Sequence, residues 1–206
     1  MKPTRPIEPR PAVPRTGLPL VAIGSSAGGP AALATILGAL PADFAAAVVV
    51  IQHIDQHVAP GMAAWLTDRC ALPVRLAAEG DRPAAGTILL AGTNDHLVLK
   101  TSTSVGYTEE PRANVYRPSV DVFFQSVARM WRGPVVGVIL TGMGRDGAIG
   151  LKALRDLGYY TIAQDEATSA VYGMPKAATS LGASVDVLPA TAIAPRLVEL
   201  FNPKAR

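Results

Sequence analysis

Short, continuous apolar runs rich in Val, Ile and Ala alternate with longer helical patterns along most of this chain of 206 residues. The apolar runs that we interpret as strands are 18–24, 45–52, 135–142 and 159–164. The helical patterns are 30–40, 60–70, 118–130 and 148–157. A strand that is apolar throughout needs cover on both faces, which is typical of a parallel sheet between two layers of helices. We therefore predict one α/β domain, a three-layer αβα sandwich with a mainly parallel, doubly wound sheet.

One region departs from this alternation. Residues 87–100 and the following segment 105–110 contain two apolar runs separated by the turn-forming residues Gly92–Asp95. Apolar runs joined by a short Gly- and Asp-containing turn favour a hairpin. We therefore predict an antiparallel hairpin inserted into the α/β domain, with its turn at 92–95.

The positive charge is confined to the first residues. The chain has a formal net charge of +3, and the first fifteen residues hold the whole excess, since Lys2, Arg5, Arg10 and Arg15 stand there against Glu8. Five of these fifteen residues are prolines, which oppose regular helix or sheet. We interpret residues 1–16 as a disordered, basic, Pro-rich tail and residues 17–206 as the globular domain. The charge balance of that domain gives no support for binding to nucleic acid.

Other classes of protein are excluded by composition. The chain has no run of about 18 apolar residues, so we expect no insertion into a membrane. The single cysteine excludes an intramolecular disulfide and favours a reducing compartment, so we expect a cytoplasmic protein. One cysteine and three scattered histidines offer no metal-ligand spacing, and we expect neither a metal nor a cofactor.

Three polar residues follow three of the predicted strands directly. Ser26 stands in the Gly- and Ser-rich turn 24–30, His53 follows the second strand, and Asp146 stands in the segment 141–147. Ligands and reactive groups collect at the carboxyl ends of parallel strands, so these residues are expected at one edge of the sheet. A serine, a histidine and an aspartate form the set of a nucleophile, its general base and the carboxylate that orients the base.

Each of these residues also has a purely structural interpretation. Serine and glycine occur in most strand-to-helix turns, Asp146 is placed to cap the following helix, and a histidine after a strand is often a core residue. His57 and His96 are rival histidines, and the simplest role for His96 is to support the hairpin turn. The three residues together, at one edge, favour catalysis.

A different function remains open. Residues 142–147 read Gly-Met-Gly-Arg-Asp-Gly, a literal G-x-G-x-x-G between a strand and a helix, and Asp165 and Glu166 follow the next strand. This pattern is typical of dinucleotide binding. Asp146 would place a carboxylate where the pyrophosphate must bind, which disfavours this alternative. A catalytically silent signalling adaptor of the same fold is the other alternative.

Longer motifs resemble a known family. The segments IGSSAGGP (23–30), VIQHI (50–54), RPSVDVFFQSVA (117–128), GVILTGMGRDG (137–147) and IAQDEATSAVYGMPKAA (162–178) resemble the protein-glutamate methylesterase of bacterial chemotaxis. The resemblance runs from about Gly17 to Phe201. It implies an αβα catalytic domain that demethylates glutamate methyl esters on chemoreceptor helices, releases methanol, and in many members deamidates glutamines.

The resemblance also assigns roles by motif position. Ser26 is the implied nucleophile, His53 the base and Asp146 the orienting acid, while the backbone N–H groups of Met143 and Ala27 are the implied oxyanion hole. Receptors are the implied partners, no cofactor is implied, and we expect a monomer.

The chain differs from the family pattern in two respects. Most members carry an N-terminal phosphoreceiver domain, whereas we expect only the Pro-rich tail before this catalytic domain. Arg145 stands where a small polar residue is frequent, and Tyr116 stands where histidine is common. Both substitutions are expected to alter contacts with the substrate.

Overall fold

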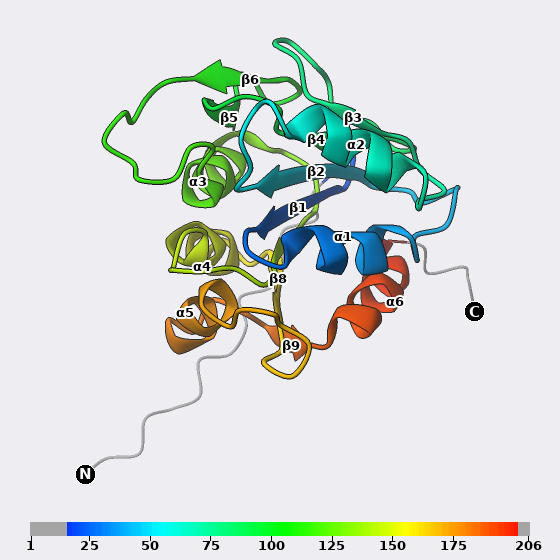
Figure 1. Cartoon of the computed structure of the whole chain (residues 1–206), viewed down its shortest axis with the longest axis vertical. Coiled ribbons are helices and arrows are strands. Elements are labelled where there is room, and N and C mark those ends of the chain that lie inside the picture. Colours follow the sequence, from blue (N-terminus) through cyan, green and yellow to red (C-terminus); the bar gives the residue numbers. More distant parts are fainter. Residues whose placement is uncertain (1–15, 202–206) are drawn as a thin grey trace.

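A computed structural model describes residues 16–201 of the chain. The tail expected at residues 1–16 lies outside the described residues, apart from Thr16. Figure 1 shows the arrangement of the helices and strands along the chain.

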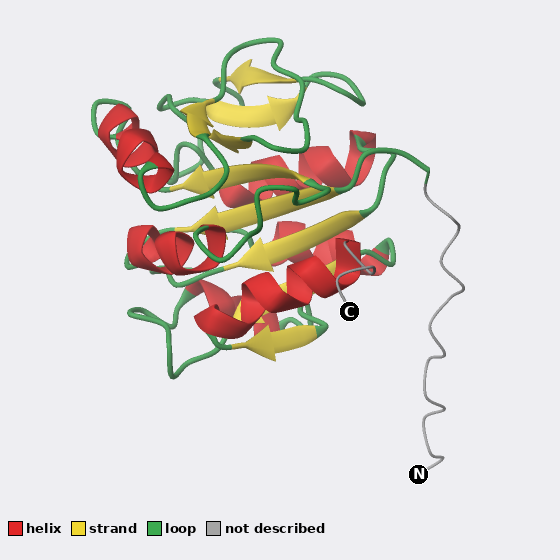
Figure 2. Cartoon of the chain, turned by 90° about the vertical axis from the view of Figure 1, so that its right-hand side faces the viewer, coloured by secondary structure: helices red, strands yellow, loops and turns green. Residues whose placement is uncertain are grey.

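A sheet of seven parallel strands forms the centre of the fold. In spatial order its strands are β3 (Val74–Leu76), β4 (Ile88–Leu90), β2 (Ala47–Gln52), β1 (Leu20–Ser25), β7 (Val135–Ile139), β8 (Tyr160–Gln164) and β9 (Asp186–Leu188). Every neighbouring pair is parallel, and Figure 2 shows these strands running in one direction. From β1 the chain adds β2, the edge strand β3 and then β4 between them on one side, and from β7 it adds β8 and β9 on the other. The boundary between β1 and β7 is therefore the topological switch point, where α/β sheets open a crevice.

Helices cover both faces of this sheet. One layer holds α1 (Gly29–Leu37), α2 (Ala59–Thr67) and α6 (Ala190–Phe201), and the other holds α3 (Val120–Met130), α4 (Ala148–Asp156) and α5 (Met174–Ser180) (Figure 1). Successive residues of β1 point to opposite layers, since Val21 packs with the first layer and Ala22 with the second. The prediction of a three-layer αβα sandwich is confirmed.

The hairpin exists, but its predicted position is wrong. Residues 88–90 form β4, a parallel strand of the main sheet that pairs with both β2 and β3. The hairpin consists of β5 (His96–Leu99) and β6 (Val105–Thr108), and residues 100–104 form its turn. Residues 92–95 instead connect the sheet to the hairpin. All of Ile88–Leu90 is buried, because a central parallel strand is covered on both faces, and a run of three such residues resembles half of a hairpin in sequence.

Four elements were not expected from the sequence: β3, β9, α5 and α6. The strands β3 and β9 each have three residues and lie at the two edges of the sheet, where the apolar pattern is interrupted by Arg75 and Asp186.

Within residues 16–201, no helix is both long enough and apolar enough to cross a membrane.

Candidate active site

The three residues expected at one edge of the sheet do lie there together. Ser26 follows β1, His53 follows β2, and Asp146 lies in the loop between β7 and α4. β1 is paired with β2 on one side and with β7 on the other. The His53 N–H donates to the Ser25 carbonyl oxygen at 3.0 Å, so the pairing of β1 and β2 continues up to the two residues.

His53 and Asp146 are in direct contact. The Nε2 atom of His53 lies 2.8 Å from Oδ2 of Asp146, and their side chains are only 11% and 6% exposed. Asp146 also accepts hydrogen bonds from the Ser119 hydroxyl at 2.8 Å and from the Val120 N–H at 2.7 Å. These donors belong to the N-terminus of α3, so the carboxylate ties the loop after β7 to that helix.

The structural alternative assumed that Asp146 caps the helix that follows it, and the structure contradicts this. The N-cap of α4 is Gly147, and the Gly150 N–H in the first turn of α4 donates to Asp121 at 2.6 Å instead. The carboxylate instead accepts hydrogen bonds at the start of α3, whose N-cap is Ser119. A buried carboxylate on a helix N-terminus is stabilised by the free N–H groups and by the helix dipole.

The environment keeps Asp146 ionised. Burial raises the pKa of this carboxyl group. Hydrogen bonds lower the pKa by more than burial raises it, and their donors are His53, the Val120 N–H, the Ser119 hydroxyl and the Asp121 N–H. The net result is a pKa below the ordinary value for aspartate. A charged carboxylate therefore faces the imidazole.

The orientation of the His53 ring leaves one nitrogen available. Nδ1 is buried and has no hydrogen-bond partner among residues 16–201. Because ionised Asp146 accepts from Nε2, the proton of the neutral ring is assigned to Nε2, and Nδ1 carries the lone pair. In the chymotrypsin-type triad Nδ1 faces the carboxylate and Nε2 faces the serine. In this protein the two nitrogens are exchanged, since Nε2 faces the carboxylate. Such an imidazole can accept a proton from a neighbouring hydroxyl group.

Ser26 lies in a sharp turn between β1 and α1. Gly28 has a φ of 78°, a left-handed conformation that glycine adopts at little cost, and it is the N-cap of α1. Gly142 allows the loop after β7 to approach this turn, because a Cβ atom on Gly142 would lie 2.8 Å from the Ser26 Cβ. The half-buried Ser26 side chain therefore faces the loop that carries Met143 and Asp146.

The two backbone N–H groups named from the sequence are available as donors. Neither the Ala27 nor the Met143 N–H has a hydrogen-bond partner in the described part of the chain, and the Met143 side chain is 65% exposed. The Thr141 hydroxyl donates to the Ala27 carbonyl at 2.9 Å and accepts from the Val171 N–H at 2.9 Å. Thr141 thus holds the serine turn and the loop after β7 in a fixed relation.

One supporting residue was missed from the sequence, Gln52. Its side chain is 3% exposed, and its Nε2 donates to the carbonyl oxygens of Ser26 at 2.9 Å and of His53 at 3.1 Å. Its Oε1 accepts from the Ser25 hydroxyl at 2.7 Å. A buried glutamine at the end of an apolar strand is the available sequence signal, since it needs partners for both its oxygen and its nitrogen.

The rival histidines have other positions. His57 lies exposed in the turn before α2. His96 is fully buried at the start of β5, where its Nδ1 accepts from the Ser119 N–H at 3.1 Å. The expectation that His96 supports the hairpin turn is wrong, since the turn is at 100–104 and the imidazole holds the N-cap of α3.

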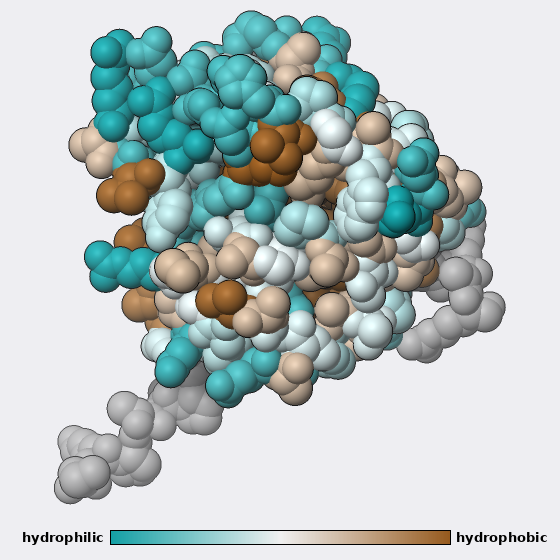
Figure 3. Space-filling view, in the orientation of Figure 1, coloured by the Kyte–Doolittle hydropathy of each residue, from teal (hydrophilic) through white to brown (hydrophobic). Residues whose placement is uncertain are grey.

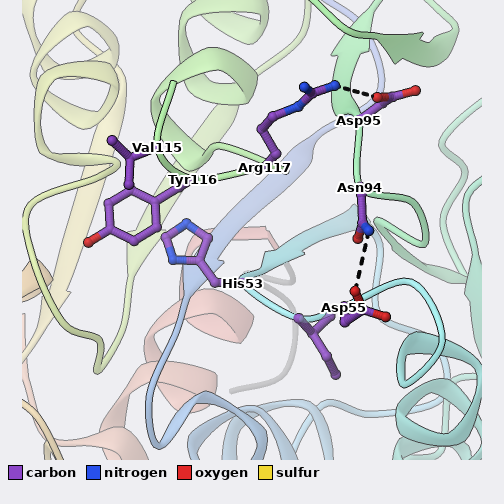
Figure 4. Close-up of a pocket in the computed structure, with 8 residues that line it drawn as sticks. His53, Asp55, Asn94, Asp95, Val115, Tyr116 and Arg117 are labelled. Atoms are coloured by element: carbon purple, nitrogen blue, oxygen red, sulfur yellow. Dashed lines mark hydrogen bonds and ion pairs between the residues drawn. The ribbon is translucent and has the colours of Figure 1, made fainter. Parts of the chain in front are cut away.

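A cavity of about 580 Å³ opens beside His53 (Figure 4). It is lined by residues of three loops: His53, Ile54, Asp55, Asn94, Asp95, Val115, Tyr116 and Arg117. Figure 4 shows the Tyr116 ring facing the imidazole, with Arg117 bound to Asp95 and Asn94 bound to Asp55 farther along the wall. Among the described residues, no group of three or more His, Cys, Asp or Glu side chains is arranged to hold a metal ion.

This architecture defines a class of protein. A doubly wound parallel sheet carries a serine turn, a histidine and a buried carboxylate on three adjacent strands, which is the arrangement of α/β proteins with a serine-hydrolase-type site. The glycine-rich segment 142–147 belongs to this site, since its Asp146 holds His53.

Comparison with known proteins identifies the family. The model of the family described as CheB methylesterase matches residues 21–197. The chain therefore belongs to the CheB methylesterase family.

Curated relatives are highly similar in sequence to this chain over part of their own length. A protein named protein-glutamate methylesterase/protein-glutamine glutaminase 1 from Cupriavidus pinatubonensis is 65% identical over 198 residues, which cover 93% of this chain and 58% of that protein. A protein of the same name, numbered 2, from Cupriavidus metallidurans is 64% identical over 190 residues, covering 92% of this chain and 55% of that protein. The chain thus spans little more than half the length of these relatives.

A solved structure matches the described fold. The catalytic domain of the CheB methylesterase of Thermotoga maritima superposes with a TM-score of 0.86 and 34% sequence identity, covering 90% of this chain and 100% of that one.

Proposed function

We propose that this chain is a catalytic unit that hydrolyses the methyl esters of glutamyl side chains on chemoreceptors and releases methanol. The observation that carries the proposal is the 2.8 Å contact between His53 and ionised Asp146, which leaves the second imidazole nitrogen buried and unpartnered. The Gln52 side chain links the backbone of His53 to that of Ser26. The relatives are named protein-glutamate methylesterases, which supports a glutamate methyl ester as the substrate.

In this mechanism His53 is the general base. Its Nδ1 accepts the proton of the Ser26 hydroxyl while Oγ attacks the side-chain carbonyl carbon of the methylated glutamate. The imidazolium then returns the proton to the methoxy oxygen as the ester bond breaks, and methanol leaves. Water, deprotonated by the same nitrogen, hydrolyses the acyl-enzyme and restores Ser26.

Asp146 and two amides complete the machinery. The carboxylate fixes the tautomer of His53 and stabilises the imidazolium. The N–H groups of Ala27 and Met143 bind the oxyanion of the tetrahedral intermediate, because both are free of other acceptors in the described chain.

The same site supports deamidation of receptor glutamines. An amide differs from the methyl ester in its leaving group, so the proton returned by His53 releases ammonia in place of methanol. The relatives' second name, protein-glutamine glutaminase, favours this activity.

We further propose that the domain acts in the cytoplasm, as a monomer, on the helices of the receptors. The exposed large apolar side chains on the face shown in Figure 3 form small separate groups among hydrophilic ones, so this face offers a second copy of the chain little continuous apolar surface to bury.

Two other functions are less well supported. Dinucleotide binding would bring a pyrophosphate to the loop that holds the ionised Asp146, and like charges repel there. A catalytically silent adaptor has no use for a buried imidazole nitrogen without a partner, since such a group costs free energy.

The test is release of methanol from receptor membranes carrying labelled methyl esters. The wild-type chain and the matched control Ser180→Ala, which alters an exposed serine at the end of α5, are expected to release methanol at equal rates. Ser26→Ala is expected to be inactive. Equal release by Ser26→Ala and wild type would refute the proposed nucleophile, and absence of release by the wild type would refute the substrate.

A further inference from the structure

Tyr116 lies flat against the imidazole of His53. The two ring centroids are 4.5 Å apart and the ring planes differ by 6°, so the rings are stacked in parallel (Figure 4). The tyrosine covers one face of the histidine whose edge is bound by Asp146. Stacked aromatic rings of this kind attract each other beyond the burial of their surface.

The hydroxyl end of Tyr116 reaches the loop that carries Met143. A Cβ atom on Gly144 would lie 2.5 Å from the Tyr116 hydroxyl oxygen, which places this oxygen directly against the Gly144 backbone. One side chain therefore contacts both the proposed base and the loop that supplies a proposed oxyanion donor.

Tyr116 also belongs to the segment that holds Asp146. It stands three residues before Ser119, whose hydroxyl donates to the carboxylate at 2.8 Å, and four before Val120, whose N–H donates at 2.7 Å. Residues 116–120 thus contact two members of the site. Tyr116 packs on the face of the His53 ring, and Ser119 and Val120 donate hydrogen bonds to Asp146. A movement of this segment would disturb both contacts at once.

A hydrogen bond at Nε2 alone leaves the imidazole free to tilt about the line to Asp146. Such a tilt would displace Nδ1, the atom that takes the Ser26 proton in the proposed mechanism, and a misplacement of about 1 Å can cost about a hundredfold in rate. The Tyr116 ring opposes this tilt because a parallel neighbour fixes the plane of the imidazole. The aromatic face also attracts the imidazolium that forms when Ser26 loses its proton.

We propose that Tyr116 is a positioning residue for His53 in the hydrolysis. The proposal rests on the proposed function for its reaction, and on the stacking geometry for its mechanism. The proposal assigns the positioning of His53 to the flat ring of Tyr116 and not to its hydroxyl group. A variant that keeps the ring and a variant that removes it are therefore expected to differ in kcat.

The experiment compares Tyr116→Leu with Tyr116→Phe in methanol release. Tyr116→Leu removes the flat ring and is expected to lower kcat by about tenfold to a hundredfold with KM changed by less than about twofold. Tyr116→Phe keeps the ring and is expected to retain kcat within about threefold of wild type. In NMR spectra, the His53 ring protons are expected to lose the upfield ring-current shift in Tyr116→Leu and to keep it in Tyr116→Phe.

The matched control is Tyr160→Leu. Tyr160 begins β8, away from the carboxyl edge of the sheet, and its hydroxyl accepts from Arg196 Nε at 3.1 Å. This variant removes a half-buried tyrosine ring and is expected to reduce stability with kcat unchanged. It therefore separates a general loss of stability from a loss of positioning.

Each result has one meaning. Wild-type kcat in Tyr116→Leu, or an equal loss in Tyr116→Leu and Tyr116→Phe, would overturn the positioning role while leaving the methylesterase proposal intact. An unchanged His53 NMR signal in Tyr116→Leu would overturn the stacking. An inactive wild-type chain would instead refute the proposed function, and with it the reaction that Tyr116 is proposed to assist.

Discussion

Asp146 accepts hydrogen bonds from four groups, which come from His53 and from the three residues that begin α3. The sequence predicted this aspartate as a partner of His53, because both follow neighbouring strands. It did not predict the donors from α3, because Ser119 and Val120 are 26 or more residues away in the chain. Contacts of this range depend on how α3 packs, and single-residue chemistry does not contain that information.

Replacing the carboxylate tests the role of Asp146. Asp146→Asn is expected to lower kcat by roughly a thousandfold to ten-thousandfold, because an amide favours the wrong tautomer of His53 and does not stabilise the imidazolium. Methanol release is the measurement. The control Asp156→Asn alters an exposed aspartate at the end of α4 and is expected to have wild-type kcat. Near-wild-type kcat in Asp146→Asn would reduce this residue to a structural link between its loop and α3.

His96 is expected to make stability depend on pH. Burial lowers the pKa of this histidine, with Arg117 acting in the same direction, against the Pro111 carbonyl and the carboxylates of Asp146 and Asp95. Because the pKa is lower in the folded state, the unfolded chain binds the additional proton. The contribution of His96 to stability is therefore complete above the unfolded pKa of about 6.5 and falls as the pH drops below it, by at most about 1.4 kcal/mol per pH unit.

Urea unfolding at pH 7.5 and pH 5.5 measures this effect. His96→Asn keeps an acceptor for the Ser119 N–H but does not titrate, so the difference between the two pH values is expected to shrink. An unchanged difference in His96→Asn would show that another group is responsible.

At the scale of elements, long apolar strands and helices were predictable, and short or mixed ones were not. β1, β2, β7 and β8 were found within two or three residues of their ends, because continuous apolar runs need burial on both faces. β4 was assigned to the hairpin, since the same apolar run fits a half-buried strand when its neighbours in space are unknown. β3 and β9 have too few residues to show a period.

Gln52 shows how the end of one strand organises the site. Gln52 lies within the motif VIQHI (50–54), but the sequence alone indicates no role for it, because the role of a buried amide depends on its hydrogen-bond partners. Gln52→Leu removes two donors to the Ser26 and His53 carbonyl groups and one acceptor for Ser25. We expect a loss of about 3 kcal/mol in the free energy of unfolding and at least about a tenfold fall in kcat.

A second variant distinguishes these two effects. Leu197→Ala in α6 removes a fully buried side chain far along the chain from the site, and is expected to cost about 2–5 kcal/mol with kcat unchanged. Urea unfolding and methanol release are measured for both variants. Equal kcat in Gln52→Leu and Leu197→Ala would mean that Gln52 contributes to stability alone.

At the scale of the whole molecule, the order of strands explains why three distant residues meet. β1 lies at the switch point between the two halves of the sheet, with β2 and β7 as its neighbours. The serine turn therefore follows the middle strand of the three, β2 with the base and β7 with the acid lie on either side of it, and the cavity lined by Tyr116 opens beside His53. The motif resemblance predicted these members, whereas the ring orientation of His53 and the stack on Tyr116 required the three-dimensional structure.

The central claim is that Ser26 and His53 act as one catalytic unit, and a double-mutant cycle tests it most directly. Single-turnover methanol release is measured for wild type, Ser26→Ala, His53→Gln and the double variant. Each single variant is expected to be slower by roughly ten-thousandfold or more, and the double variant no slower than the slower single variant, because either loss already disables the unit. A double variant whose loss equals the product of the single losses, or a single variant that stays near the wild-type rate, would contradict the claim.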